Sequence, residues 1–242
     1  MKIVAKTDVG MVRESNQDSY TTGELPDGVA WAVVCDGMGG AAGGNVASST
    51  AVKVIAEQIT SSFRPGMSAN SIKNMMVSAI NAANISVYDI SCSNSELSGM
   101  GTTVVCAIVM EHTAYIAHAG DSRAYLVSHG VLTQLTRDHS VVQELVEHGK
   151  ITALEAKRHP NKNIITRAVG VSREILVDFC EQEIKDGDVL LLCTDGLTNF
   201  VEPDEMCDLT KDDMFYEFAE RLVNRANKNG GGDNVTVVAV TY

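Results

Sequence analysis

The amino-acid sequence predicts an α+β fold in which antiparallel sheets are covered by helices. Apolar runs of strand length recur along the chain, and two-residue turns separate some of them, at residues 111–112 and 129–130. Parallel neighbours need much longer crossovers, so these strands are predicted to pair antiparallel. Two long helical patterns lie between the strand-forming blocks and a third comes near the end, which places helices on the faces of the sheets.

Length and composition describe one globular unit. The chain has 242 residues, of which 45% are hydrophobic and 21% charged, enough apolar material for a sizeable core. We find no internal repeat, low-complexity tract or linker in it. Residues 1–242 are therefore expected to form a single domain.

Charge and cysteine usage limit the compartment and the partners. The formal net charge of −12 disfavours binding to nucleic acid or to an anionic membrane. No apolar run approaches the roughly 18 residues of a membrane span, and no charged-then-apolar leader is present. The six cysteines form no CxxC pair, so neither a disulfide framework nor a zinc site is expected. These features favour a cytoplasmic protein.

The first third of the chain shows strand patterns and then helix patterns. Residues 1–7 alternate as a strand does, residues 8–18 are polar without a period, and residues 30–35 form an apolar strand. Helices are predicted over residues 45–63 and 70–91, because apolar side chains recur there at helical spacing.

The middle of the chain indicates hairpins. Residues 101–110 are predicted to pair with residues 113–119, and residues 122–127 with residues 131–135.

Residues 136–170 differ from the segments around them. They are polar, carry several arginines and histidines, and show only short helical patches, one of which begins with a capping box at residues 152–155. We predict an irregular lobe over one edge of the fold, where a partner could dock. The remaining predicted elements are strands over residues 175–184 and 188–194, a helix over about residues 212–227 and a final strand over residues 235–240.

Four apolar strands carry an aspartate at one end with a glycine beside it. These aspartates are Asp36, Asp121, Asp195 and Asp233. A charge at the tip of a buried strand is costly unless something compensates it. If the four strand ends converge, several negative charges crowd together and must bind cations. Oxygen ligands without His or Cys favour hard ions, so the pattern predicts a site for Mg²⁺ or Mn²⁺.

Seven motifs extend this pattern over almost the entire chain. They are Arg13-Glu14-Ser15-Asn16-Gln17-Asp18, Asp36-Gly37-Met38-Gly39-Gly40, Gly101-Thr102-Thr103, Gly120-Asp121-Ser122-Arg123, Thr136-Arg137-Asp138-His139-Ser140, Cys193-Thr194-Asp195-Gly196-Leu197 and Gly232-Asp233-Asn234-Val235-Thr236. In this order they resemble the metal-dependent type 2C Ser/Thr protein phosphatases, specifically their compact bacterial branch. The resemblance implies a four-layer α-β-β-α sandwich of two antiparallel sheets flanked by helices, with a mobile flap subdomain at about residues 136–170.

The resemblance also implies a ligand set for Mn²⁺ or Mg²⁺. Asp36 would bridge two core ions, with the backbone carbonyl of Gly37 completing one of them. Asp195 and Asp233 would hold the other core ion. Asp121 would join Asp195 at a third, weaker ion.

Two further residues receive roles from the resemblance, and three positions depart from it. Asp18 would orient metal-bound water from outside the ligand set, and Arg13 would grip the substrate phosphate, for which a guanidinium fork is suited. Many eukaryotic members carry a proton-donating His where Met38 stands, and bacterial relatives often carry His and Glu at the places of Ala41 and Asn45.

The implied activity is that of a protein serine/threonine phosphatase, a signalling hydrolase that cleaves phosphoserine and phosphothreonine monoesters by direct attack of a metal-bridging water or hydroxide. Phosphorylated proteins, a Ser/Thr kinase of the same cell and that kinase's targets are the implied partners, and we expect a monomer.

Two alternatives stay open. Because Met38 cannot donate a proton, the chain could be a catalytically silent phosphoprotein-binding module. A nucleotide-binding protein would use residues 37–44 as a phosphate cradle, although no Gly-Lys-Ser/Thr follows them.

Overall fold

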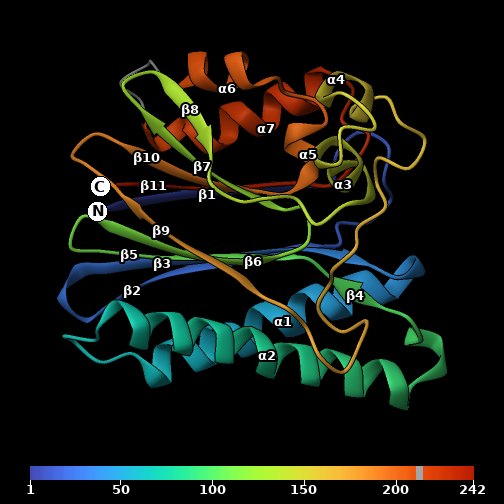
Figure 1. Ribbon diagram of the computed structural model, residues 1–242, viewed down its shortest axis with the longest axis horizontal. Helices are drawn as coiled ribbons and strands as arrows, with labels where there is room; N and C mark the ends of the chain where they lie inside the picture. The colour runs from blue at the N-terminus through green and yellow to red at the C-terminus, as the bar shows by residue number, and fades with distance from the viewer. Residues whose placement is uncertain (211–214) are drawn as a thin grey trace.

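The computed structural model describes residues 1–210 and 215–242, except for the side chains of residues 41 and 42. Two sheets pack face to face, and helices cover the outer face of each, so the molecule has four layers (Figure 1). The α-β-β-α sandwich that the resemblance implies is confirmed. The strands are β1 (Lys2–Asp8), β2 (Asp18–Leu25), β3 (Val29–Met38), β4 (Gly101–Thr102), β5 (Val104–Met110), β6 (Thr113–Ala119), β7 (Arg123–Ser128), β8 (Val131–Gln134), β9 (Asp178–Glu183), β10 (Val189–Cys193) and β11 (Val235–Thr241).

The helices belong to the two outer layers and to the loops at one end of the sandwich. Helices α1 and α2 cover one sheet, α6 and α7 cover the other, and α3, α4 and α5 lie toward the right-hand end in Figure 1. The α-helices are α1 (Gly40–Ser62), α2 (Ala69–Ser93), α3 (Val141–Glu147), α4 (Ala153–Ala156), α5 (Asp195–Thr198), α6 (Pro203–Leu209) and α7 (Phe218–Lys228). Short 3-10 turns occupy Pro26–Gly28, Ser95–Leu97 and Phe215–Glu217.

Both sheets are antiparallel throughout. One has the order β2-β3-β5-β6-β9, with β4 paired to β3, and the other has the order β1-β11-β10-β7-β8. The two predicted hairpins exist, and their turn residues take the positive φ angles that tight hairpin turns require. They lie in different sheets, however, because the chain crosses from β6 to β7 through the Gly120–Ser122 connection. Hairpin chemistry is local, so the sequence could not show which sheet each hairpin joins.

The side chains of β3 point alternately to its two faces and so contribute to two of the three apolar cores. Trp31, Val33 and Cys35 face α1 and α2, while Ala32 and Val34 face the other sheet. The predicted apolar stripe of α2 is buried in the same core as Trp31, and the face of α7 packs into a third core against β10 and β11. Because successive strand residues point to opposite faces, one apolar strand can serve two layers.

The element boundaries differ from the predicted ones at several places. Strand β2 was not predicted, because its residues are mostly polar and only half-buried at an edge of the sheet. Helix α1 begins five residues before the predicted residue 45, in the glycine-rich stretch. Strand β9 begins at Asp178 rather than residue 175, and the short helices α5 and α6 were also missed. Of the last predicted helix, residues 212–214 lie outside the described residues.

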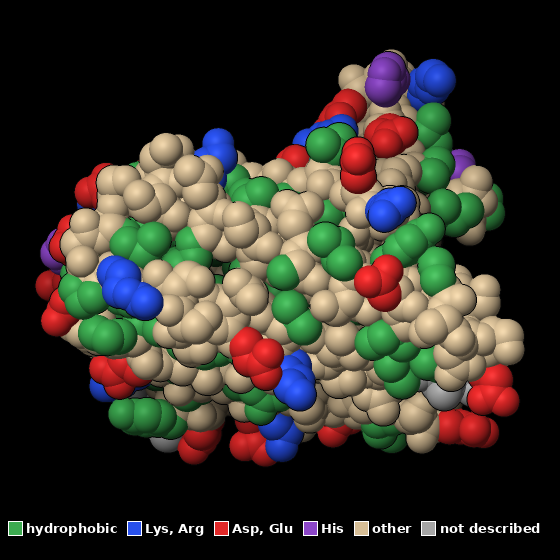
Figure 2. Space-filling model, turned by 90° about the horizontal axis from the view of Figure 1, so that it is seen from below, with side chains coloured by type: hydrophobic (Ala, Val, Ile, Leu, Met, Phe, Trp, Pro, Cys, Tyr) green, Lys and Arg blue, Asp and Glu red, His purple; other side chains and the backbone are tan. Residues whose placement is uncertain are grey.

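Viewed from the side of α1 and α2, acidic and basic side chains are scattered over the surface among small apolar groups (Figure 2). Among the described residues, no helix is both long and apolar enough to cross a membrane.

Candidate metal centre

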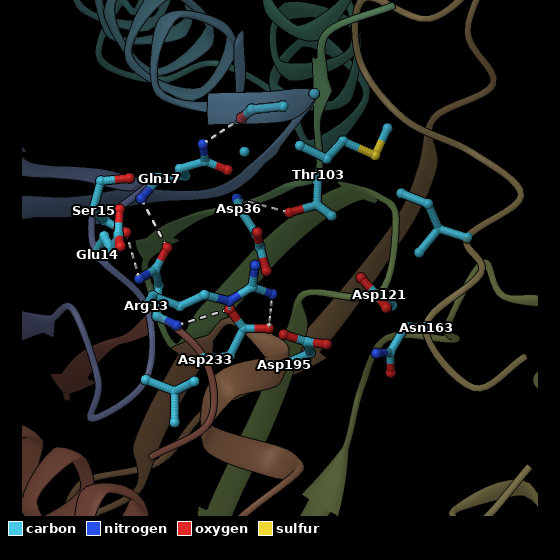
Figure 3. Close-up of a pocket in the computed structure, with 17 residues that line it drawn as sticks. Arg13, Glu14, Ser15, Gln17, Asp36, Thr103, Asp121, Asn163, Asp195 and Asp233 are labelled. Carbon is cyan, nitrogen blue, oxygen red and sulfur yellow. Dashed lines mark hydrogen bonds and ion pairs between the residues drawn. The ribbon is translucent and has the colours of Figure 1, made fainter. Parts of the chain in front are cut away.

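The four aspartates at strand ends line one pocket of about 870 Å³. Asp36 belongs to β3 of one sheet, whereas Asp195 follows β10 and Asp233 precedes β11 of the other sheet. Asp121 lies in the connection between the two sheets, directly after Gly120. In Figure 3 their carboxylates face a common space. The predicted convergence is thus confirmed, and it occurs where both sheets end together.

Asp36 and Gly37 are held by backbone and hydroxyl contacts. The backbone N–H of Asp36 donates to Oγ1 of Thr103 at 3.0 Å, and the hydroxyl of Thr102 donates to the Asp36 carbonyl at 2.8 Å. A Cβ on Gly37 would lie 2.0 Å from the carbonyl oxygen of Gly44, so only glycine permits this close approach of strand and helix. This close contact lies within residues 37–44, the stretch that a nucleotide-binding protein would use as a phosphate cradle.

Asp195 and Asp233 are brought together by another close glycine contact. Gly196, the second residue of α5, lies against the residue after Asp233: a Cβ there would be 1.8 Å from the carbonyl oxygen of Asn234. The amide of Asn199 donates to Oδ2 of Asp195 at 2.9 Å and fixes the rotamer of that carboxylate. The distance between these two aspartates therefore depends on the absence of a side chain at one position.

Arg13 reaches the same pocket from the polar segment before β2. Its Nε lies 2.9 Å from Oδ1 of Asp233, and its Nη2 donates to Oδ2 at 2.9 Å, a two-pronged ion pair that Figure 3 shows across the pocket. A guanidinium has five N–H donors, so the pair with Asp233 leaves others directed at the pocket. Asn163 and Ile165 of the lobe form the opposite wall.

Asp18 lies behind the pocket and is 7% exposed. The hydroxyls of Thr194 and Thr236 donate to its Oδ2 at 2.9 and 2.7 Å. Its Oδ1 is buried and has no hydrogen-bond partner among the described residues. Burial raises the pKa of Asp18 to about 7, and the two hydroxyls oppose that shift. A buried carboxylate oxygen without a partner is costly, which indicates that water or a ligand belongs beside it.

Asp36, Asp121 and Asp195 have raised pKa values for the same two reasons. Desolvation raises the pKa of Asp121 to about 7, and the charge of Asp195 adds to the shift. The pKa of Asp36 lies well above its ordinary range because of desolvation and then the charges of neighbouring carboxylates, and the pKa of Asp195 is also raised, by desolvation and then by Asp233. Clustered carboxylates behave in this way when no cation balances them.

The donor set fits hard divalent cations. All the candidate ligands are carboxylate or carbonyl oxygens, the type that Mg²⁺ and Mn²⁺ prefer. The raised pKa values and the unpartnered Oδ1 of Asp18 both show a deficit of positive charge and of hydrogen-bond donors at this end of the sandwich. A cation would offset both.

Three residues, Met38, Ala41 and Asn45, depart from the pattern of the resembling family, and the two whose side chains are described occupy different places relative to the pocket. Met38 lines the pocket with a thioether, which carries no transferable proton. Asn45 is exposed on α1 and does not line this pocket. The side chain of Ala41 lies outside the described residues.

Asn234 belongs to one of the seven motifs, but the sequence predicts no role for it. Its Oδ1 accepts from the Gln17 backbone N–H at 2.8 Å, and its Nδ2 donates to the carbonyls of Val9 and Ser15, each at 2.9 Å. Asn234 therefore holds the polar segment that carries Arg13 at three positions. Further contacts act on the same segment: the Met11 N–H donates to the Gly231 carbonyl at 2.7 Å, and the Asn16 amide donates to the Thr7 hydroxyl at 2.8 Å. A contact between segments more than two hundred residues apart leaves no local signal in the sequence.

We expect Asn234→Ala to cost about 3 kcal/mol of stability, since the N–H of Gln17 and the carbonyls of Val9 and Ser15 lose these part-buried hydrogen bonds. The KM for a phosphorylated peptide should rise about tenfold, the equivalent of ~1.4 kcal/mol in binding, because Arg13 loses its fixed position. Thermal unfolding and steady-state kinetics would measure both effects. The control is Asn229→Ala, which removes an exposed amide that donates to the carbonyl of Phe200. Equal KM values for Asn234→Ala and wild type would contradict the prediction.

Comparisons with known proteins agree with this geometry. A model of the family described as protein phosphatase 2C matches residues 12–237. The serine/threonine phosphatase stp of Listeria monocytogenes is 39% identical over 236 residues, covering 97% of this chain and 93% of that protein. The structure of the S. agalactiae serine/threonine phosphatase superposes with a TM-score of 0.93 at 32% identity, covering 100% and 99% of the two chains. The catalytic domain of the phosphatase PstP in complex with two manganese ions superposes with a TM-score of 0.85 at 33% identity, covering 98% and 96%.

Proposed function

The chain belongs to the protein phosphatase 2C family, and from that premise we propose that it is a metal-dependent protein serine/threonine phosphatase. The observation that carries the proposal is the convergence of four carboxylates and one guanidinium on a single pocket. Phosphorylated proteins would be its substrates. We further propose residues 1–242 as one catalytic domain, acting as a monomer in the cytoplasm and opposing a Ser/Thr kinase of the same cell.

The carboxylates that line the pocket, together with one backbone carbonyl, form the proposed set of metal ligands. Asp36 would bridge two Mn²⁺ or Mg²⁺ ions, the carbonyl of Gly37 would complete one of them, and Asp195 and Asp233 would hold the other. Asp121 would join Asp195 at a third, weaker ion. When bound, the cations would neutralise phosphate charge and make a coordinated water more acidic.

The remaining residues would orient the reactants. The ion pair with Asp233 fixes the plane of the Arg13 guanidinium, and its free N–H groups would bind two phosphate oxygens of the substrate. Asp18 would accept a hydrogen bond from water through its unpartnered Oδ1. Met38 cannot protonate the leaving alkoxide, so that proton would come from water. The lobe of residues 136–170 contributes Asn163 and Ile165 to the pocket wall, which supports its assignment as the flap.

The test is phosphate release from a phosphothreonine peptide, measured with Mn²⁺, then with excess chelator, and again after Mn²⁺ is restored. We expect release only with the cation. Release that persists in chelator would overturn the metal dependence. Peptide binding without release under any divalent cation would instead identify a silent phosphoprotein-binding module, and ATP binding in a calorimeter would favour the nucleotide-binding alternative.

A further inference from the structure

The two ends of the lobe (residues 136–170) meet at His139, whose side chain is 1% exposed. The backbone N–H of His139 donates to the carbonyl of Gly120 at 3.0 Å, and its carbonyl accepts from the N–H of Thr166 at 2.8 Å. Gly120 directly precedes Asp121, and Thr166 follows Ile165 of the pocket wall. A single residue thus joins both ends of the lobe to the connection that carries Asp121.

The imidazole of His139 makes a second pair of contacts. The N–H of Gly120 donates to its Nδ1 at 3.1 Å, so Nδ1 carries no proton. The proton of the neutral ring is then on Nε2, which donates to Oδ2 of Asp178 at 3.2 Å. Oδ1 of Asp178 also accepts from Arg167 at 2.6 Å. Burial lowers the pKa of His139, in agreement with a neutral ring.

A second histidine completes this network. The ring of His118 stacks on that of His139 with 4.8 Å between centroids and 8° between planes, and its Nε2 donates to the carbonyl of Arg137 at 2.9 Å. His118, His139 and Asp178 offer ligand atoms within 4.8 Å of one another, a spacing that could suit a metal ion. The proton positions favour a hydrogen-bonded network instead, because Nε2 of His139 bears a proton and the lone pairs of parallel rings do not converge.

We propose that His139 is a positioning residue that couples the lobe to Asp121. His139 donates one hydrogen bond to the Gly120 carbonyl and accepts one from the Gly120 N–H, which fixes both sides of this glycine. The φ of Gly120 is 115°, a conformation that L side chains rarely adopt. Thr103 closes the other side of this turn, since a Cβ on Gly120 would lie 2.7 Å from the Thr103 side chain. A displacement of the lobe therefore moves Asp121. The inference rests on the proposed function in one respect, the role of Asp121 as a ligand of the weaker ion.

The test is calorimetric titration of the full chain with Mn²⁺ alone, which resolves the ions by affinity without substrate. We expect His139→Ala to weaken the weakest Mn²⁺ site about tenfold, as loss of a group that orients a ligand does, and to leave the tighter sites unchanged. His139→Asn should recover most of the affinity, because its amide oxygen can accept from the Gly120 N–H in place of Nδ1. His148→Ala is the matched control, an exposed histidine of the same lobe that follows the last residue of α3 and whose Nδ1 donates to the carbonyl of Glu144 in that helix.

A double-mutant cycle separates this inference from the proposed function. Asp121→Asn should remove the weakest Mn²⁺ site, and His139→Ala added to it should change nothing further. If Asp121→Asn removes that site while His139→Ala leaves it intact, the coupling is overturned and the ligand role of Asp121 stands. If Asp121→Asn leaves all Mn²⁺ binding intact, the ligand role falls and the coupling with it. Should His139→Ala fail to fold, Asp178→Ala breaks the same network at a partly exposed side chain, and unaltered Mn²⁺ affinity there would overturn the coupling.

Discussion

Replacing Asp195 by Asn should abolish phosphate release without unfolding the protein. The change removes one negative charge from a group of carboxylates whose pKa values are raised by desolvation and, after that, by the charges of their neighbours. Bound cations supply several kcal/mol of transition-state stabilisation, so we expect kcat to fall by about 10³-fold or more. In chelator, the melting temperature should equal or exceed that of wild type, because the repulsion is reduced. Phosphopeptide hydrolysis with Mn²⁺ and thermal unfolding measured by circular dichroism test both statements.

The matched control is Asp186→Asn, which removes the same charge from an exposed turn before β10. It should leave kcat unchanged. If Asp195→Asn retained full activity, the assignment of Asp195 as a ligand would fail. If it lost activity and melted far below wild type in chelator, the loss would reflect unfolding and the prediction would be equally wrong.

Gly196→Ala should be the most destabilising single-methyl change near the site. The added Cβ would lie 1.8 Å from the carbonyl oxygen of Asn234, and both partners are backbone, so α5 or the start of β11 must move. Overpacking of this kind costs about 3 kcal/mol or more, which corresponds to a fall of roughly 10 °C in melting temperature for a chain of this size. The movement would also separate Asp195 from Asp233 and lower Mn²⁺ affinity, as calorimetry can measure.

Gly187→Ala provides the comparison. Gly187 has a φ of 86° and nothing within 4 Å of a built Cβ, so its cost is backbone strain alone, about 1 kcal/mol. This variant should bind Mn²⁺ as wild type does. Similar melting temperatures for the two alanine variants would show that the close approach at Gly196 does not limit stability.

Aspartates at the ends of apolar strands were sufficient to predict the pocket. Each of the pocket aspartates Asp36, Asp121, Asp195 and Asp233 has a glycine neighbour and an apolar run on one side, and that combination is visible without a structure. Burial of the strands and the cost of an unbalanced charge at each tip make convergence the favourable arrangement. The prediction was right because both signals, apolar strand and terminal charge, are local.

The contacts that hold the pocket in shape were not predictable in this way. These contacts are hydrogen bonds between segments that are distant in the sequence. They join Asn234 to Ser15, His139 to Gly120, and the hydroxyls of Thr194 and Thr236 to Asp18. A single Asn, His or Thr is an ordinary surface residue until the fold brings its partner within hydrogen-bond reach. The buried histidines His118 and His139 show this most directly, since they belong to different segments of the sequence and their rings stack only in the folded chain.

Most strands and helices, the antiparallel hairpins, the acidic strand ends and the resemblance to a phosphatase family could be predicted before the fold was known, because each depends on neighbouring residues or on short motifs. Three features appear only in the folded chain: the sheet that each hairpin joins, the pairing of Arg13 with Asp233, and the connection of the lobe to Asp121 through His139. These depend on which distant surfaces pack together, and packing is a property of the whole chain.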